Sequence, residues 1–213
     1  MARKTKQQAL ETRHEILDAA LACFSAHGVS ATSLTDIARR AGVTRGAIYW
    51  HFKNKTDLLN EILAHSESGI ADVEKEYQLK YPDDPLSVMR DTLIYALAAT
   101  ARDTHRRKLL EVLFHKCEFV GEMVALQQLQ QILFLECHDK IIQMLNQCIE
   151  AGQLPAALNT RRAAIVLRAY VTGVLENWLF LPESFDMVAE APAMVQCMID
   201  TLRLSPTLCD QPA

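Results

Sequence analysis

Four residues near the N-terminus have the types and the spacing of a surface that contacts a nucleic-acid groove. On a helical wheel turned by about 100° per residue, Arg45, Gly46, Tyr49 and Trp50 share one side. A guanidinium donates hydrogen bonds to base edges, and a glycine lets the helix approach a groove wall without a Cβ atom in between. Large exposed rings lower solubility unless a partner covers them. The pattern favours a groove-facing surface; the alternative is that Tyr49 and Trp50 belong to a small three-helix core.

The helix that carries this surface is predicted to be capped by Thr44 and to extend through Phe52. Ser33, followed three residues later by Asp36, has the spacing of a capping box and begins a shorter helix before it. Gly42 provides the tight turn between the two helices. Two short helices joined around a glycine form a helix-turn-helix, whose second helix can lie in the major groove. The opposite side of the second helix is apolar and faces a core: Val43, Ala47, Ile48 and Phe52.

Helices are also predicted on both sides of this pair. Residues 11–26 show apolar positions four residues apart, the stripe of an amphipathic helix, and Gly28 ends it. Asn54, with Asp57 three positions later, caps a fourth helix. The two-helix motif is therefore expected to sit within a bundle of helices.

The charge of the chain is distributed unevenly. Residues 1–55 carry nine Lys or Arg and four acids, a net charge of +5, while the remainder carries −9. A basic segment on an acidic body is typical of a nucleic-acid-binding module attached to a part that must not bind nucleic acid. The alternative is that short segments vary in charge by chance, so the interpretation depends on the helices that the segment builds.

The sequence gives no support for catalysis or for a bound metal. It contains no G-x-S-x-G, H-E-x-x-H, P-loop or Rossmann glycine pattern, and none of its six cysteines forms a C-x-x-C pair. We therefore expect no enzyme activity, no cofactor and no metal site. No run of eighteen apolar residues could span a membrane, and the charged residues 1–6 do not resemble a secretory signal. The expected location is the cytoplasm, with no membrane partner.

The rest of the chain is also predicted to be helical, with no strand pattern and no internal repeat. Pro82 and Pro85 break the chain after the fourth helix, and Gly152 ends a long helix. Pro192 lies where the final helix should be under way, so that helix either starts near Ala191 or is kinked. The predicted helical segments after the first break are 86–97, 106–114, 122–151, 160–180 and 191–204.

The segment Thr32-Ser-Leu-Thr-Asp-Ile-Ala-Arg-Arg-Ala-Gly-Val-Thr-Arg-Gly-Ala-Ile-Tyr-Trp-His-Phe-Lys-Asn-Lys55 resembles the DNA-binding signature of the TetR family of transcriptional repressors. The segments 114–123, 160–164 and 176–186 are similar to the AcrR branch, repressors of resistance-nodulation-division multidrug efflux pump operons. The resemblance implies an all-α fold, with a three-helix helix-turn-helix domain at residues 1–54 on a larger helical ligand-binding and dimerisation domain at 55–213.

The resemblance also implies a set of DNA contacts. Lys4 and Lys6 would form a basic arm along the DNA backbone or minor groove, and Lys55 would begin the fourth helix against a phosphate. The wheel alone places His51 nearer the core, so its DNA role comes only from the resemblance. The expected DNA-binding residues are Lys4, Lys6, Ser33, Thr44, Arg45, Gly46, Tyr49, Trp50, His51 and Lys55.

A small-molecule pocket is expected between the middle helices. Pockets in helical bundles are mostly apolar with a few polar groups, and the resemblance implies one near the fourth helix that takes bulky, often cationic inducers: drugs, dyes, bile-type or plant compounds. Glu67 is the predicted carboxylate, against the alternative of a solvated surface Glu; the other positions could equally be plain core. The predicted pocket residues are Glu67, His65, Phe114, Cys117, Gln130, Phe134 and Cys137.

The helix at 160–180 is apolar on most of its circumference and must therefore be covered on every side. It lies either at a subunit interface or at the centre of a monomeric core. The resemblance implies that the last two helices pair with a second copy as a four-helix homodimer interface. The predicted interface residues are Ala164, Leu167, Val171, Val174, Leu175, Trp178, Met194 and Met198.

Two functions fit these observations. The first is a ligand-released, dimeric repressor that binds a pseudo-palindromic operator in double-stranded DNA. The alternative is an all-α small-molecule-binding or catalytic protein whose basic N-terminal segment docks a protein partner. DNA binding that depends on Tyr49 and Trp50 distinguishes them.

Overall fold

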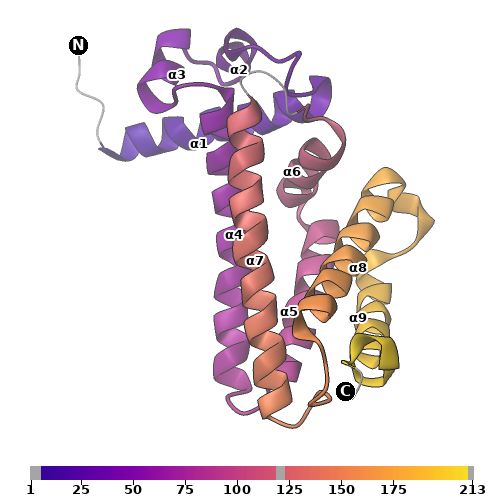
Figure 1. The fold of residues 1–213 in the computed structure, drawn as a ribbon. Coiled ribbons are helices and arrows are strands. Elements are labelled where there is room, and N and C mark those ends of the chain that lie inside the picture. The colour runs from indigo at the N-terminus through magenta and orange to yellow at the C-terminus, as the bar shows by residue number, and fades with distance from the viewer. Residues whose placement is uncertain (1–5, 119–122, 211–213) are drawn as a thin grey trace. The chain divides into compact units, whose positions relative to one another are not determined.

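The structure is a computed structural model that describes residues 6–118 and 123–210, without the side chains of residues 66–68 and 129. The predicted all-α fold class is confirmed, because the described residues contain helices and one isolated bridge, Leu158 to Cys209, but no strand (Figure 1). The helices are α1 (Lys6–His27), α2 (Leu34–Arg40), α3 (Arg45–His51), α4 (Lys55–Lys80), α5 (Pro85–Arg102), α6 (Thr104–His115), α7 (Val124–Glu150), α8 (Thr160–Phe180) and α9 (Met187–Leu204), with short 3-10 helices η2 (Pro182–Ser184) and η3 (Pro206–Leu208).

One compact unit comprises residues 1–67 and 104–129. Within it α1 contacts α2 and α6, and α2 contacts α3; Figure 1 shows α2 and α3 together on one side of α1. The apolar stripes predicted for these helices meet in one core, which explains why such short helices are stable. Its fully buried side chains include Ile16, Phe24, Ile37, Ile48, Phe52 and Leu58.

The predicted caps begin the helices of this unit. Around α2, the Ser33 hydroxyl accepts a hydrogen bond from the Asp36 amide at 3.2 Å, and the Asp36 carboxylate accepts one from the Ser33 amide at 3.1 Å. At the start of α4, Asn54 Oδ1 accepts from the Asp57 amide at 2.8 Å. Gly42, between α2 and α3, has a φ of +66°, a conformation that side chains with a Cβ rarely adopt.

The other compact unit comprises residues 68–103 and 130–213. Its packing is dominated by α5 against α9, and α8 also contacts α9. The long helix predicted at 122–151 is observed as α7, although Glu122 lies outside the described residues. The core of this unit includes Leu86, Leu97, Leu145, Ala164, Leu167, Val195 and Ile199.

Of the two alternatives for the last helix, the start near Ala191 is wrong, because α9 begins four residues earlier, at Met187. Asp186 caps α9, its Oδ1 accepting hydrogen bonds from the amides of Val188 at 2.9 Å and Ala189 at 3.1 Å. Pro192 therefore lies inside the helix, as its sixth residue. Proline has no N–H to donate to the carbonyl four residues earlier, so the helix tolerates one missing hydrogen bond at Val188.

Candidate functional site

The third helix presents Tyr49 and Trp50 to solvent. Thr44 caps it, its hydroxyl accepting a hydrogen bond from the Ala47 amide at 3.2 Å. Ile48 and Phe52 are buried beneath it, whereas Tyr49 is 50% and Trp50 74% exposed. The rings are therefore not part of the three-helix core, and the predicted division of the helix into an apolar and an exposed side is observed.

Arg45 and Tyr49 contact each other on the exposed side of α3. The Arg45 Nη2 atom donates to the Tyr49 hydroxyl at 2.9 Å, and the guanidinium carbon lies 5.4 Å from the centre of the Tyr49 ring. One turn of helix separates the two residues, so they share a face. A Cβ added to Gly46 would meet only the Thr44 hydroxyl, at 3.8 Å, so the backbone beside this pair is open to approach.

His51 and Ser33 have contacts of their own. The His51 ring packs edge-on against Trp50, with ring centres 4.7 Å apart, and is half-buried, as the wheel indicates. The Ser33 hydroxyl donates to the Asp36 carboxylate at 2.6 Å. This bond and the one from the Ser33 amide lower the pKa of Asp36. Ser33 is exposed at the start of α2, and its hydroxyl also serves as the helix cap.

Lys55 holds the connection between α1 and α2. Its Nζ atom donates to the carbonyl oxygens of Val29 at 2.9 Å and Ser30 at 3.5 Å. A small cavity of about 330 Å³ lies between residues 30–34, Tyr49 and residues 53–55. Lys55 therefore lies beside an open recess next to α3. Of the predicted basic arm, Lys6 is exposed at the start of α1, and Lys4 lies outside the described residues.

An ion pair behind α3, between Arg13 and Glu61, is not predicted from the sequence. Arg13 of α1 donates to the carboxylate of Glu61 on α4, and its guanidinium carbon lies 4.7 Å above the ring of Phe52. The hydrogen bond from Arg13 lowers the pKa of Glu61, and in return raises the pKa of Arg13. The pair joins two helices around the last residue of the α3 segment. No local spacing could reveal it, because 48 positions separate the partners.

The end of α6 is bound to the end of α1. Lys116 donates from Nζ to the Ser25 carbonyl at 2.6 Å, and its own carbonyl accepts from the Val29 amide at 3.0 Å. At the other end of α6, His105 Nε2 lies 3.5 Å from the carboxylate of Asp18. These contacts also span large sequence separations and were not predicted. They fix the loop that leads into α2.

The predicted pocket residues are divided between the two compact units: His65, Phe114 and Cys117 belong to one, and Gln130, Phe134 and Cys137 to the other. Burial raises the pKa of the Cys117 thiol, while Cys137 is exposed. The guanidinium of Arg168 lies 3.8 Å from the centre of the Phe134 ring. The side chain of Glu67 lies outside the described residues.

Two buried polar atoms in the second unit have no hydrogen-bond partner among the described residues: Thr92 Oγ1 on α5 and His138 Nδ1 on α7. A buried polar atom without a partner costs free energy, so such an atom is usually bonded to water, an ion or another polar group. Neither residue was predicted as a site residue from the sequence. A threonine and a histidine on helix faces carry no signal until their burial is known.

Comparison with known proteins decides the family. Residues 16–62 match the model described as bacterial regulatory proteins, tetR family, and residues 84–204 match the model described as MAATS-type transcriptional repressor, C-terminal region. The chain belongs to the TetR family of transcriptional regulators.

Similar members of the TetR family match nearly the whole chain. The HTH-type transcriptional regulator AcrR of Shigella flexneri is 58% identical, covering 98% of this chain and 97% of that protein. The crystal structure of NalD, the secondary repressor of the MexAB-OprM multidrug efflux pump in Pseudomonas aeruginosa, has a TM-score of 0.83 at 31% identity, covering 94% of this chain and all of that one. A SmeT–triclosan complex has a TM-score of 0.80 at 29% identity, covering 95% and 99%.

In this TetR family chain, α8 and α9 bury part of the predicted interface within the protomer. Ala164, Leu167, Trp178 and Met198 are buried, and Trp178 Nε1 donates to the Phe185 carbonyl at 3.2 Å. The remaining predicted interface residues are half-buried: Val171, Val174, Leu175 and Met194. Large apolar side chains of these helices remain exposed: Ile165, Val166, Phe180 and Leu204.

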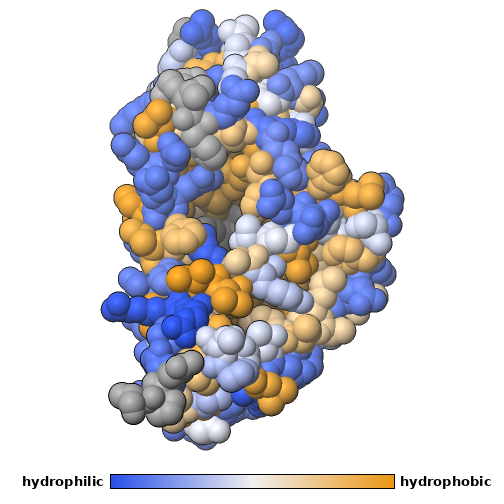
Figure 2. Space-filling model, turned by 45° about the vertical axis from the view of Figure 1, so that its right-hand side comes forward, coloured by the Kyte–Doolittle hydropathy of each residue, from blue (hydrophilic) through white to orange (hydrophobic). Residues whose placement is uncertain are grey.

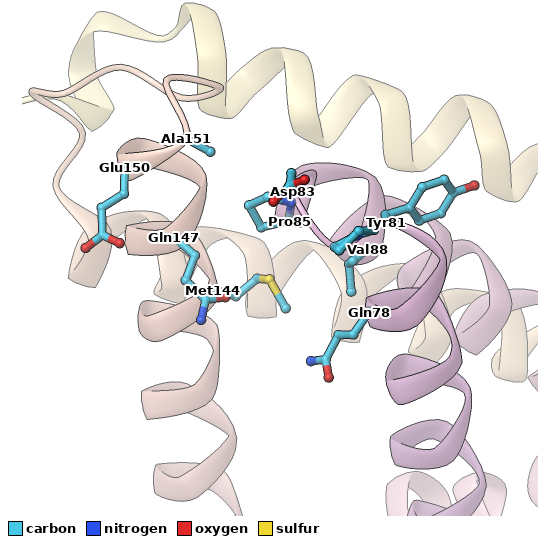
Figure 3. Close-up of a pocket in the computed structure, with 10 residues that line it drawn as sticks. Gln78, Tyr81, Asp83, Pro85, Val88, Met144, Gln147, Glu150 and Ala151 are labelled. Atoms are coloured by element: carbon cyan, nitrogen blue, oxygen red, sulfur yellow. The ribbon is translucent and has the colours of Figure 1, made fainter.

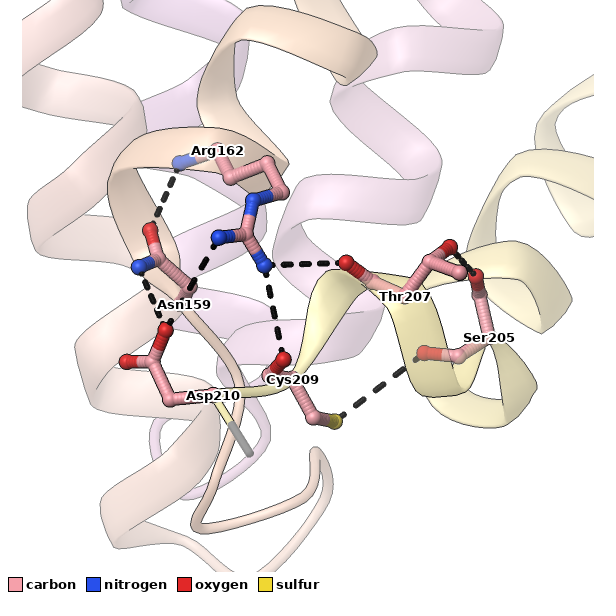
Figure 4. Close-up of polar contacts among 6 residues, drawn as sticks. All are labelled: Asn159, Arg162, Ser205, Thr207, Cys209 and Asp210. Carbon is pink, nitrogen blue, oxygen red and sulfur yellow. Dashed lines mark hydrogen bonds and ion pairs between the residues drawn. The ribbon is translucent and has the colours of Figure 1, made fainter. Parts of the chain in front are cut away.

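The first turn of α8 is held by the C-terminal segment (Figure 4). The Arg162 Nη1 atom donates to the carbonyls of Thr207 at 2.9 Å and Cys209 at 3.4 Å. The Asn159 amide nitrogen donates to the Asp210 carboxylate at 2.8 Å. Because Thr207 and Cys209 follow α9, these bonds fix the start of α8 against the end of α9 in this TetR family protein.

Among the described helices, α8 alone is long and apolar enough to cross a membrane by length and composition. Buried Ala163, Ala164 and Leu167 show that one side of it packs inside the protein. Apolar surface also remains among polar residues on the face drawn in Figure 2.

No three His, Cys, Asp or Glu side chains in the described part of the chain gather as a metal site.

Proposed function

We propose that this TetR family regulator is a homodimeric repressor of a multidrug efflux pump operon, released from its operator by bulky, often cationic compounds. The observation that carries the proposal is the exposed face of α3, where Arg45 bonded to Tyr49 stands beside Trp50. Among the similar proteins, AcrR of Shigella flexneri is a transcriptional regulator, and NalD of Pseudomonas aeruginosa is a repressor of a multidrug efflux pump. A regulator of this kind acts in the cytoplasm, where its DNA is.

In this proposal, residues 1–54 bind DNA, and residues 55–213 bind the ligand and form the dimer. In the first part, Arg45 reads base edges while Tyr49 and Trp50 contact bases and sugars in the major groove. Lys53 and Lys55 line the recess of about 330 Å³ next to Tyr49, and we propose that they contact a phosphate group of the duplex. Thr44, Gly46 and His51 complete the contact surface.

The inducer site lies among the helices of the second part. Support comes from the buried, unpartnered Thr92 Oγ1 and His138 Nδ1, which a polar group of a ligand could satisfy. Glu67 is proposed as the carboxylate that favours cations. Calorimetry of Glu67→Gln with one cationic and one neutral compound of similar size tests it: a selective loss for the cation supports the role, and equal losses or none contradict it.

The homodimer is proposed to form through α8 and α9. The half-buried side chains Val171, Val174 and Leu175 and the exposed Ile165, Phe180 and Leu204 provide apolar area that a second copy would cover. Buried Ala164, Leu167, Trp178 and Met198 would then shape this surface from beneath. A two-fold dimer requires a pseudo-palindromic operator with half-sites about one helical turn apart, or a multiple of it.

The proposal is tested by fluorescence anisotropy with duplex DNA from upstream of the protein's own gene and with random duplex. Arg45→Ala should lower specific affinity about five- to 150-fold, the loss of 1–3 kcal/mol from one base contact, and lower random binding far less. Lys55→Ala should weaken both and flatten the salt dependence. Arg161→Ala, an exposed residue of α8, is the control with the same charge change.

The alternative function is a small-molecule-binding or catalytic protein whose N-terminal segment docks a protein. That function requires no binding to either duplex. If wild-type protein bound neither DNA at low salt, the repressor proposal would be abandoned in favour of protein docking.

A further inference from the structure

A groove of about 650 Å³ lies at one end of the second compact unit (Figure 3). One wall is the last turn of α4 with the turn that follows and the start of α5, and the other is the end of α7. In Figure 3, Met144 and Gln78 extend toward each other from these opposite walls, and Asp83 lies beside Pro85 at the start of α5. The lining residues are Gln78, Tyr81, Pro82, Asp83, Pro85, Val88, Met144, Gln147, Glu150 and Ala151.

The walls of the groove are joined by hydrogen bonds. Gln153, which follows α7, donates from Nε2 to the Asp84 carboxylate at 2.6 Å and accepts at Oε1 from the Leu86 amide at 3.0 Å. The same carboxylate accepts from the Ser87 amide at 2.9 Å. These bonds hold the start of α5 at a fixed distance from the end of α7, so the groove is formed before any ligand arrives.

The lining is acidic and includes a few apolar side chains. Asp83 and Glu150 are the acidic residues of the lining, and none of the ten lining residues is basic. The nearest cations lie at the Tyr81 side of the groove: the Lys80 ammonium is 4.7 Å from the centre of the Tyr81 ring, and Arg90 Nε is 2.8 Å from the Asp91 carboxylate. The Tyr81 ring is directed away from the α7 wall in Figure 3. Buried Val88 and half-buried Met144 supply apolar contact.

We propose that this groove is a second small-molecule site, which binds an ammonium ion with an apolar body: the ammonium at Asp83, the body against Met144 and Val88. Carboxylate and amide oxygens accept hydrogen bonds from the ammonium, and the thioether and Val88 cover the hydrocarbon. Glu150 points away from the opposite wall in Figure 3, so it adds attraction from the outer edge only. The inference is independent of operator binding and of the inducer site proposed above.

The groove is open, so binding will be weak. A ligand of eleven heavy atoms at ordinary efficiency binds with a Kd on the order of 1 mM. Nuclear magnetic resonance detects such binding, and Met144 supplies a reporter inside the groove. The chain has seven methionines, so a protein labelled with ¹³C at the methionine methyl groups gives few signals, and Met144→Leu assigns the one that matters.

The experiment titrates the labelled full-length protein, without DNA, with 4-phenylbutylamine, protonated at pH 7, and with the neutral 4-phenylbutanol. The expected result is a saturable shift of the Met144 signal, with a Kd for the amine about three- to fivefold below that for the alcohol. Asp83→Asn should remove this difference. Asp72→Asn, an exposed acid of α4 outside the groove lining, makes the same charge change and should leave it.

Three results would overturn the proposal. A Met144 signal that stays in place while other methionines shift would locate binding elsewhere, which is compatible with the proposed inducer site. Equal affinities for amine and alcohol, or an unchanged preference in Asp83→Asn, would show that charge is not recognised. If Asp83→Asn fails to fold by circular dichroism, the same comparison is made with Gln78→Ala, which should raise the Kd for both compounds by removing one wall contact; an unchanged Kd counts against the site.

Discussion

The Lys116 ammonium donates to the backbone carbonyl of Ser25 at 2.6 Å, across 91 positions of sequence. Ser25 lies in the last turn of α1, where helix carbonyls lack partners within the helix and carry a partial negative charge. The Lys116 carbonyl also accepts from the Val29 amide. Lys55 donates to the same loop at Val29 and Ser30, so two lysines from different helices fix the segment that leads into α2.

We expect Lys116→Met to lower the free energy of unfolding by about 1 kcal/mol, the cost of one charge-assisted hydrogen bond at a half-exposed site. Methionine retains most of the apolar stem, so the loss isolates the ammonium. The melting temperature should fall by a few degrees in a calorimetric scan. Lys140→Met, exposed on α7, is the control and should melt as the wild type does; an equal fall in both would assign the effect to net charge.

The hydrogen bond between Arg45 and Tyr49 predicts a graded series in DNA binding. Tyr49→Phe removes only the hydroxyl that accepts from Arg45, so specific affinity should fall modestly, about threefold, through a less ordered guanidinium. Tyr49→Ala removes the exposed ring as well and should fall further. Anisotropy with specific and random duplex measures both variants. Identical losses for the two would mean that the ring contributes nothing beyond its hydroxyl.

The pair Arg13 and Glu61 predicts a pH dependence of stability. The pKa of Glu61 is lowered in the folded protein, chiefly by the hydrogen bond from Arg13. A lowered carboxyl pKa stabilises the folded state above the unfolded pKa, about 4.3, and this stabilisation is lost as the pH falls through the folded pKa. Glu61→Gln should therefore lower the melting temperature at pH 7 and reduce its dependence on pH below about 4.5. The effect is at most about 1 kcal/mol, because both side chains are partly exposed.

The control for this pair is Asp72→Asn, whose exposed partner Lys75 lies on the same helix. Its melting curve should follow the wild type across the pH range. A Glu61→Gln variant that keeps the full wild-type fall in acid would show that other carboxylates govern acid unfolding.

Local signals predicted the helices and the exposed face of α3, and tertiary contacts escaped prediction. Ser33 with Asp36, Thr44 and Gly42 act within a few residues, so their spacing is readable in the sequence. Arg13 with Glu61 and Lys116 with Ser25 depend on which helices pack together, which no spacing records. The start of α9 was left open between Ala191 and a helix that contains Pro192, because the cap that decides it, Asp186, was not recognised in the sequence.

The half-buried residues of α8 predict a dissociable dimer. Leu175→Arg should place a charge in whatever covers this face and yield a folded monomer with poor operator binding, visible by light scattering and circular dichroism. Leu79→Arg, on an exposed position of α4, is the control and should remain dimeric. An unfolded Leu175→Arg protein would assign that position to the core of the protomer, and an unchanged dimer would remove it from the interface.

Two threonines on α5 provide a matched test of the proposed inducer site. The hydroxyl of Thr92 is buried without a hydrogen-bond partner in the described structure, whereas the Thr100 hydroxyl donates to the Ala96 carbonyl at 3.0 Å. Replacing an unsatisfied buried hydroxyl by a methyl group removes a desolvation cost, so Thr92→Val should raise the free energy of unfolding by about 1 kcal/mol. Thr100→Val should lower it, because a formed hydrogen bond is lost.

If the Thr92 hydroxyl forms a hydrogen bond with the inducer, Thr92→Val will both gain stability and lose inducer affinity. The loss should appear in calorimetry as a higher Kd for compounds with a hydrogen-bonding group, while operator affinity in the absence of inducer stays as in the wild type. Thr100→Val should show the reverse pattern, lower stability with unchanged inducer Kd. If Thr92→Val is more stable and binds every inducer as well as the wild type does, the buried hydroxyl is only a cost in stability that the fold tolerates. The polar contact of the inducer must then come from another group, and His138 is the first to examine.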